Sequence, residues 1–291
     1  MVPQVDAAVK QRLPRECDGS NAACMDQESP PHIAPQNPEG GAAPRPFPFP
    51  VSYEYSIQHK RRVDPQLGFF GFAVRIAGLI ALIPVILVLL YAIIPPVSTL
   101  MLSRWMTLQR VERVWTPISE ISPHVVRMVI AGEDGRYCAH RGVDWQELQA
   151  VIDDYAEHGD ARGASTIPMQ VAKNLFLWPG RQVIRKVFEV PLAYLMSAVW
   201  SKTRMMEIYL NIAEWGPDGE FGIEAASRRA FRKSARDLTA EEAALLAGAL
   251  PNPLIRDPRR AGPQLSKAAQ TRLRIAANNG SAAVSCVISR R

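Results

Sequence analysis

Cysteine is scarce in this chain, with 4 in 291 residues. Cys17 and Cys24 lie in a proline-rich N-terminal stretch, Cys138 is near the middle, and Cys286 is close to the C-terminus. The four include no CxxC pair and no Cys/His spacing of the kind that holds zinc. The sequence therefore argues against a disulfide scaffold and against a structural metal site.

A large excess of charge of one sign is also missing. Lys and Arg total 34 against 28 Asp and Glu, and charged residues make up 21%, which excludes a wholly disordered chain. The segment 98–252 holds 18 basic and 19 acidic residues, whereas 253–291 holds 8 and 1. A nucleic-acid-binding domain carries its basic residues across the folded body or along one helix. We therefore expect no nucleic-acid partner.

One long uncharged run is present, since residues 76–94 read IAGLIALIPVILVLLYAII. As a helix this run spans about 28 Å, close to the roughly 30 Å of a bilayer's hydrocarbon core. The sequence predicts a single transmembrane helix over 68–96. Basic residues are somewhat more frequent before the run than after it, which favours a cytoplasmic N-terminus. They are Lys60, Arg61, Arg62 and Arg75 before it, and Arg104, Arg110 and Arg113 after it.

The segments on either side of this run differ in composition. Residues 1–50 hold 10 of the 24 prolines, so 1–67 is predicted to be a disordered cytoplasmic extension or, alternatively, a proline-rich ligand for a partner. Residues 97–255 are expected to form one globular domain. The basic tail, 256–291, is expected either to be solvated or to contact anionic lipid headgroups.

Helical patterns recur between residues 97 and 255, while strand alternation is scarce. Asp144 is the expected N-cap of a helix that runs through VIDDYAEH. Thr239 and Glu242 match the capping box that precedes an apolar helix. Further helices are predicted over 167–177, 186–200, 202–212 and 221–232. The predicted fold class is therefore mostly α.

Three groups of polar residues have two interpretations each. Glu189 is the one acidic residue in an otherwise apolar helix, one turn after Arg185, and forms either a simple ion pair or a functional site. The adjacent acids Glu133 and Asp134, with His140 after them, are either solvated or catalytic. The third group is either a solvated helix face or a binding surface, and comprises Ser165, Gln170, Lys173 and Asn174.

Taken in order, the motifs resemble those of the peptidoglycan glycosyltransferases, family 51 of the glycosyltransferases. EDGRYCAHRGVD at 133–144 resembles their first signature, GASTIPMQVAKNLFLW at 163–178 the second, RKVFE at 185–189 the third, and SKTRMMEIYLNIAEWG at 201–216 the fourth. The resemblance covers roughly 95–255, and the S-x-x-K, S-x-N and K-T-G set of a transpeptidase is absent. It implies a mostly α, lysozyme-like domain of a monofunctional enzyme.

The family polymerises lipid II into β-1,4-linked glycan strands, with inversion and release of undecaprenyl pyrophosphate. The resemblance thus implies a bacterial inner-membrane protein whose catalytic domain is periplasmic. It makes Glu133 the general base, and Glu189 a second carboxylate that positions the leaving group or a divalent cation, Mg²⁺ or Mn²⁺. It assigns Lys173, Arg185 and Lys186 to the pyrophosphate, Gln170 and Ser165 to substrate contacts, and Asp134, His140 and Asn174 to supporting roles.

The expected partners are lipid II, the growing glycan strand, the membrane, and other cell-wall synthases or division proteins; no organic cofactor is expected. One alternative is a membrane-anchored, lysozyme-like enzyme that cleaves glycans. Against it, glycan hydrolysis has no pyrophosphate for a basic cluster to neutralise. Another is a non-enzymatic scaffold of the cell-wall machinery, which leaves Glu133 and Lys173 unexplained. Met169 and Tyr137 stand where many family members have glutamine and phenylalanine, and neither change touches the two glutamates.

Overall fold

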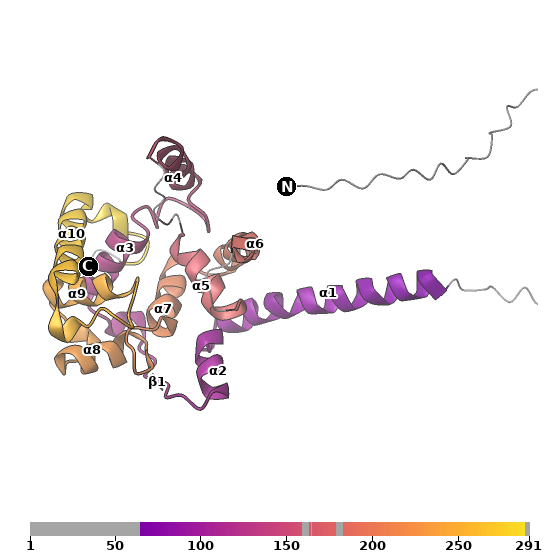
Figure 1. Cartoon of the computed structure of the whole chain (residues 1–291), viewed down its shortest axis with the longest axis horizontal. Coiled ribbons are helices and arrows are strands. Elements are labelled where there is room, and N and C mark those ends of the chain that lie inside the picture. Colours follow the sequence, from indigo (N-terminus) through magenta and orange to yellow (C-terminus); the bar gives the residue numbers. More distant parts are fainter. Residues whose placement is uncertain (1–64, 159–162, 164, 179–182, 289–291) are drawn as a thin grey trace, which may run out of the picture. The chain divides into compact units, whose positions relative to one another are not determined.

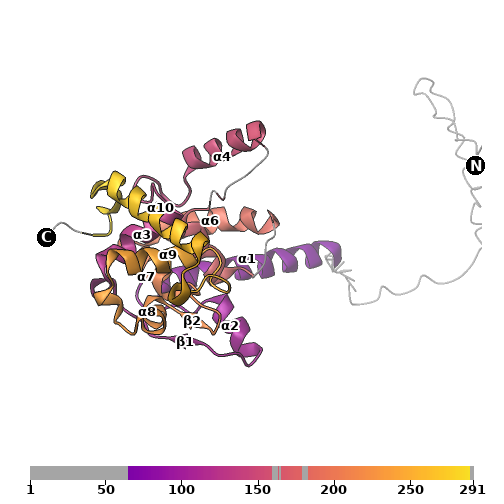
Figure 2. The same ribbon diagram turned by 60° about the vertical axis from the view of Figure 1, so that its left-hand side comes forward.

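The structure is a computed structural model that describes residues 65–158, 163, 165–178 and 183–288. These residues are mostly α-helical, as the sequence predicts (Figure 1), with one short parallel strand pair (Figure 2). The helices are α1 (Pro65–Tyr91), α2 (Thr99–Met106), α3 (Pro123–Glu133), α4 (Trp145–His158), α5 (Ile167–Phe176), α6 (Val183–Val199), α7 (Lys202–Ile212), α8 (Ile223–Phe231), α9 (Ala240–Ala249) and α10 (Pro263–Asn279). The strands are β1 (Glu112–Arg113) and β2 (Glu220–Phe221), and short 3₁₀ helices are η1 (Ile118–Glu120), η2 (Ala235–Asp237), η3 (Pro258–Arg260) and η4 (Ala282–Val284). Residues 1–64, with most of the predicted extension 1–67 and two of the cysteines, lie outside the described residues. Residues 65–67 belong to α1, which begins three residues before the predicted start of the membrane helix.

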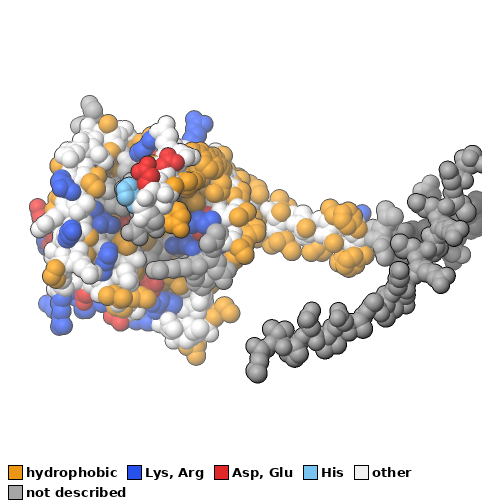
Figure 3. Space-filling model, turned by 45° about the horizontal axis from the view of Figure 1, so that its top comes forward, with side chains coloured by type: hydrophobic (Ala, Val, Ile, Leu, Met, Phe, Trp, Pro, Cys, Tyr) orange, Lys and Arg blue, Asp and Glu red, His pale blue; other side chains and the backbone are white. Residues whose placement is uncertain are grey.

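α1 is the helix that the sequence predicts to span the membrane. Its segment Phe69–Tyr91 has 23 residues with a mean hydropathy of 2.7 and is almost entirely exposed (Figure 3). The helix ends at Tyr91, five residues before the predicted end, since Pro95 restricts the residues just before it. Arg204 Nη2 donates to Tyr91 O at 2.9 Å, so a side chain of α7 holds the C-terminal end of α1. One helix able to cross a bilayer is therefore found among the described residues.

The core is built by helices that are distant in the sequence. α5 packs on α6 and α7, α3 packs on α9, and α10 lies across both α9 and α3 (Figures 1 and 2). Trp215, Tyr137, Tyr209 and Phe221 are among the largest side chains that this packing buries completely. Burial of each such side chain contributes roughly 1.5–3 kcal/mol to stability. This core holds the ends of α3, α5 and α6, which carry the candidate site.

The helix caps agree with the sequence analysis. Asp144 Oδ1 accepts a hydrogen bond from Glu147 N at 3.1 Å at the start of α4. Thr239 and Glu242 form the reciprocal capping box of α9. Because these side chains satisfy N–H groups that the first helical turn leaves free, short-range sequence pattern was enough to locate both helix starts.

The starts of two helices within the domain also shift. α6 begins at Val183, three residues before the predicted start. α8 begins at Ile223 rather than at 221, because Glu220–Phe221 pairs with β1. Gly222 between strand and helix has φ of +86°, a backbone conformation that glycine adopts without a steric penalty. The turn therefore separates a strand from the helix, where the sequence predicted one continuous helix.

The C-terminal segment belongs to the fold, and this corrects the prediction of a solvated tail beyond residue 255. Leu265 and Ala269 of α10 are 3% and 5% exposed and pack towards α9 and α3. Val284 of η4 is 4% exposed. Apolar residues recur here at helical spacing, a pattern that the strong positive charge of the segment obscured.

One disulfide joins Cys138, in the loop after α3, to Cys286, which follows η4. The low cysteine content led to the expectation of no disulfide scaffold, and it did not reveal this bond. The two residues are 148 positions apart, and no local spacing marks them as a pair. In the chain-entropy model, a closed loop of this length stabilises the fold by about 5 kcal/mol.

Candidate active site

Glu133 is the last residue of α3 and faces a cleft of about 470 Å³. Its side chain is 12% exposed. α3 presents one apolar face to the core, and this packing fixes the direction in which its C-terminal residue points. The cleft is lined by Glu133, Asp134, Arg136, Asp144, Ser165 and Thr166, among others.

Asp134 ties the loop after α3 to the start of α5. Its carboxylate oxygens lie 2.9 and 3.1 Å from His140 Nε2, and Oδ2 also accepts a hydrogen bond from Ile167 N at 2.9 Å. A carboxylate at a helix N-terminus is stabilised by the free N–H groups there. Asp134 and His140 are both buried, and their contacts hold the loop after α3 against the start of α5.

Gln170 and Tyr209 reach Glu133 from α5 and α7. Gln170 Nε2 donates to Glu133 Oε2 at 3.4 Å, and Tyr209 Oη donates to Gln170 Oε1 at 3.1 Å. Burial, with the charge of Glu133 as a smaller cause, raises the pKa of Tyr209 well above its usual 10.0. The phenol therefore stays protonated and orients the amide of Gln170 so that its N–H groups face the carboxylate.

Arg272 of α10 is a site residue that the sequence analysis missed. Its Nη2 lies 3.0 Å from Glu133 Oε1, and its side chain is only 9% exposed. Gly132 makes this approach possible, because a Cβ at that position would lie 2.1 Å from Arg272 Nε. The helical spacing from Leu265 through Ala269 to Arg272 is the signal that places this arginine on the buried face of α10.

A second carboxylate lies on α6 among cations. Glu189 Oε1 is 2.8 Å from Arg185 Nε, and Glu189 Oε2 is 3.0 Å from Lys186 Nζ. Arg185 also donates to Trp178 O at 3.1 Å, and Lys186 donates to the Ser165 hydroxyl. The structure thus brings together four predicted residues in one cluster, Ser165 from the segment just before α5 and Arg185, Lys186 and Glu189 from α6.

Lys173 on α5 lies within electrostatic reach of both carboxylates. Burial, and then the charge of Arg185, lower its pKa below the usual 10.5, while Glu189 and more weakly Glu133 oppose this shift. Among the described residues its ammonium group has no hydrogen-bond or ion-pair partner. An anionic ligand bound beside this half-buried ammonium group would supply its counter-charge and favour its protonated form.

The remaining predicted positions lie beside the site. Asn174 contributes its backbone carbonyl, which accepts from Thr99 Oγ1 at 3.1 Å and so links α5 to α2. Met169 is buried against Val143 and Ala193. Tyr137 is fully buried and keeps the aromatic packing role expected of it.

The profile of the transglycosylase family matches residues 100–279. This range contains all the candidate site residues, and it includes α10 with Arg272. The chain belongs to the transglycosylase family. Membership confirms the predicted class of enzyme, one that transfers glycosyl groups, and it lends no support to a glycan-cleaving enzyme or a non-enzymatic scaffold.

Proteins named biosynthetic peptidoglycan transglycosylase are similar to this transglycosylase. That of Brucella suis biovar 1 is 54% identical over 188 residues, which cover 64% of this chain and 84% of the relative. That of Rhodopseudomonas palustris strain HaA2 is 51% identical over 189 residues, covering 65% and 83%. That of Nitrobacter hamburgensis is 53% identical over 197 residues, covering 67% and 86%.

The transglycosylase site does not fit a divalent cation held by Glu189. Both oxygens of this carboxylate already face cations, those of Arg185 and Lys186, and Glu189 is 1% exposed. Within the described ranges, no group of three or more His, Cys, Asp or Glu side chains is placed to hold a metal ion. With these ion pairs Glu189 does not fit as the ligand of an Mg²⁺ or Mn²⁺ ion, and a divalent cation elsewhere at the site stays a prediction.

Proposed function

We propose that this transglycosylase synthesises peptidoglycan by polymerising lipid II into β-1,4-linked glycan strands, with inversion and release of undecaprenyl pyrophosphate. The observation that carries the proposal is the pairing of a cleft-facing carboxylate, Glu133, with a separate cationic cluster on α5 and α6. The names of the relatives support peptidoglycan as the product. In this reaction a sugar hydroxyl loses a proton while a diphosphate departs. The carboxylate accepts the proton, and the cationic cluster neutralises the diphosphate.

Glu133 acts as the general base. Its Oε1 is held by Arg272, and its Oε2 faces Gln170 at the long distance of 3.4 Å. The attacking hydroxyl of the acceptor's GlcNAc gives its proton to this carboxylate as its oxygen bonds to the anomeric carbon of the donor. General-base catalysis of this kind contributes about 10²–10⁴ in rate.

Lys173, Arg185 and Lys186 bind the pyrophosphate that leaves from the opposite face of that carbon. As charge develops on the leaving oxygen, fixed cations stabilise it without the reorganisation that water would need. Glu189 holds Arg185 and Lys186 in place by its two ion pairs. Ser165 and Gln170, both in the second signature, contact the sugars of the substrate. Asp134 and His140 hold the loop that follows the base.

The same proposal places the catalytic domain on the periplasmic side of the inner membrane, with the N-terminus in the cytoplasm. α6 packs against α1, and its Ile184, Val187 and Phe188 are 69%, 70% and 48% exposed. An exposed apolar face next to a membrane helix favours contact with lipid. The domain without α1 is expected to float with vesicles of bacterial phospholipid at low salt; recovery only in the soluble fraction would contradict this contact.

Labelled lipid II tests the function directly. The full-length protein in detergent is expected to convert it into a ladder of glycan strands on a gel, and a muramidase should digest that ladder. Free undecaprenyl pyrophosphate should appear at the same rate. If purified protein leaves lipid II intact, the proposal fails. Cooperation with other cell-wall synthases or division proteins stays a prediction.

A further inference from the structure

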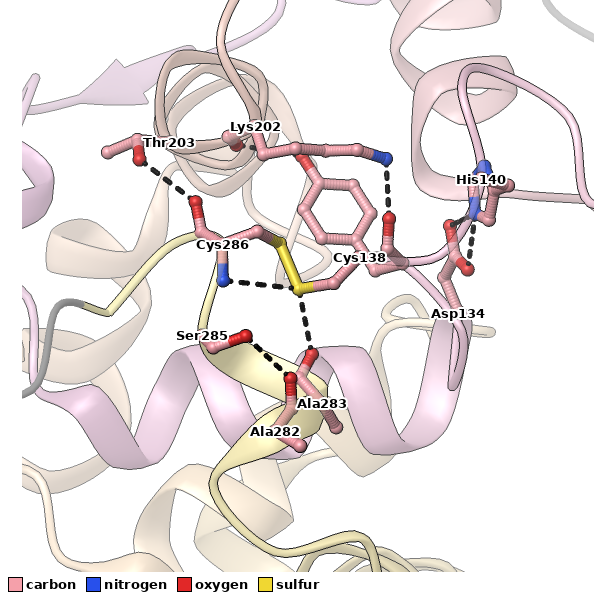
Figure 4. The surroundings of a disulfide bond; sticks show 10 residues. Asp134, Cys138, His140, Lys202, Thr203, Ala282, Ala283, Ser285 and Cys286 are labelled. Atoms are coloured by element: carbon pink, nitrogen blue, oxygen red, sulfur yellow. Dashed lines mark hydrogen bonds and ion pairs between the residues drawn. A yellow bond between two sulfur atoms is a disulfide. The ribbon is translucent and has the colours of Figure 1, made fainter.

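The Cys138–Cys286 disulfide lies beside the loop that follows the candidate base (Figure 4). Cys138 is five residues beyond Glu133 in the sequence. Its neighbour Tyr137 is fully buried, with its hydroxyl donating to Lys202 O at 2.8 Å. The loop is therefore attached to α7 through Tyr137 and to the C-terminal segment through the disulfide.

Cys286 stands at the far end of a segment that begins with α10. Arg272 on α10 reaches Glu133 itself, and η4 packs on α3 with Val284 buried. The carbonyl of Cys286 accepts from Thr203 Oγ1 at 3.4 Å. The segment from α10 to Cys286 thus meets the catalytic region twice, once at the carboxylate and once at the loop behind it.

The contact between Arg272 and Glu133 depends on the position of α10. Arg272 Nε is buried, and it has no hydrogen-bond partner in the part of the chain that the structure describes. The guanidinium passes close over Gly132, where even a Cβ would collide with it. Its place is therefore set mainly by how α10 packs, and a shift of α10 would carry it away from the carboxylate.

We propose that the Cys138–Cys286 disulfide is a positioning element of the active site. It holds the catalytic loop and the segment from α10 to Cys286 together, so that Arg272 keeps Glu133 oriented towards the acceptor hydroxyl. Reduction of the bond loosens both and slows glycosyl transfer.

The bond forms by exchange with an oxidant that itself carries a disulfide. The two cysteine thiols lose two electrons and two protons, and the oxidant leaves as two thiols. Disulfides persist in the bacterial periplasm and are rare in the cytosol. The enzyme therefore reaches its full rate of glycosyl transfer only in the periplasm, where its substrate is expected.

The first test compares two pairs of substitutions in the full-length protein. C138S/C286S removes the disulfide, while the matched control C17S/C24S removes the two cysteines of the N-terminal stretch. This arm rests on the proposed function and uses labelled lipid II. We expect kcat to fall about tenfold to a hundredfold in C138S/C286S, as a displacement of about 1 Å at a catalytic group does, with KM little changed. Wild-type kcat in C138S/C286S would overturn the proposal.

A double-mutant cycle separates positioning from a general loss of stability. Arg272→Lys is made both in the wild-type chain and in C138S/C286S. If the disulfide acts through Arg272, the combined variant should be little slower than the slower of its two parents, because residues that act together are not additive. Fully additive losses would show that the bond contributes to folding stability alone, and would refute the positioning role.

A third measurement needs no lipid substrate, so it distinguishes failure of this inference from failure of the proposed function. Backbone amide exchange is recorded on the wild-type protein before and after reduction with a phosphine. We expect faster exchange over 134–143 and 263–288, with α5 and α7 unchanged. Equal protection in both states would overturn the inference. Because this arm uses folded wild-type protein, it remains decisive if C138S/C286S does not fold.

Discussion

The two glutamates of the site are held in opposite ways. Glu189 finds its cations, Arg185 and Lys186, within one turn of the same helix, and its side chain is 2% exposed. Glu133 finds its cation, Arg272, 139 residues away on α10, and keeps 12% exposure at the edge of the cleft. One carboxylate is therefore surrounded by its own helix, and the other is reached by a separate element.

This difference supports the roles proposed for the two glutamates, positioning for Glu189 and proton transfer for Glu133. Each oxygen of Glu189 faces a charged donor and the residue is only 1% exposed, so Glu189 orients Arg185 and Lys186 and is hardly accessible to an incoming hydroxyl. Glu133 has one oxygen on Arg272 and only a long contact from Gln170 on the other. A general base must be reachable by the hydroxyl that it deprotonates. The comparison therefore supports the proposal that Glu133 takes the proton.

Substitution of Glu133 should have the largest effect. Glu133→Gln keeps the size of the side chain but removes the base, so the rate of lipid II polymerisation is expected to fall by about 10²–10⁴. Circular dichroism should show an intact fold. Glu241→Gln, at an exposed position of α9, is the matched control and should polymerise normally. A Glu133→Gln enzyme with normal rate would remove Glu133 from the mechanism.

The two arginine partners provide the next test. Arg272→Ala leaves Glu133 without its ion pair, and loss of one partner of a buried pair costs about 3–5 kcal/mol. Arg185→Ala leaves Glu189 with Lys186, so its effect on the melting temperature should be smaller. The melting temperature, measured by calorimetry, and kcat of both variants show which substitution has the larger effect. A greater loss of stability in Arg185→Ala would contradict the contrast drawn between the two glutamates.

Because of Lys173, donor binding should weaken at alkaline pH. Burial lowers its pKa below 10.5, and the charged form is the one that binds diphosphate. Donor affinity is therefore complete below the lowered pKa and is lost as pH rises through it. Lys173→Arg stays charged over this range, so its rise in KM for lipid II should move to higher pH. Identical pH profiles of KM for the two proteins would exclude Lys173 from the pyrophosphate site.

Lys186 should show the smallest effect. Its side chain is 45% exposed, and exposed ion pairs contribute only about 0–1 kcal/mol. Lys186→Ala is expected to leave the melting temperature nearly unchanged and to raise KM for lipid II modestly, since the contact with the Ser165 hydroxyl is also lost. A large fall in melting temperature would show that Lys186 supports the fold as well as the substrate.

The sequence predicted those parts of the site whose partners are close along the chain. The ion pair of Arg185 and Glu189 was readable from their spacing on one helix, and the cap of α4 from Asp144. The motif resemblance supplied the roles of residues far apart, such as Glu133 and Lys173, but it did not extend to α10. Arg272 was not considered, because the net positive charge of residues 256–291 suggested a tail outside the folded domain.

By itself, the sequence determined the uncharged helix α1, the mostly α character of the domain, and the local pairs on α6, because hydrophobic periodicity, caps and i,i+4 contacts depend on neighbours within a few residues. Only the tertiary structure decided that α10 covers α3, that Arg272 meets Glu133, and that Cys138 bonds to Cys286. Those contacts join residues 139 and 148 positions apart. Such pairs meet only after the core has packed, since no short-range pattern specifies which distant surfaces come together.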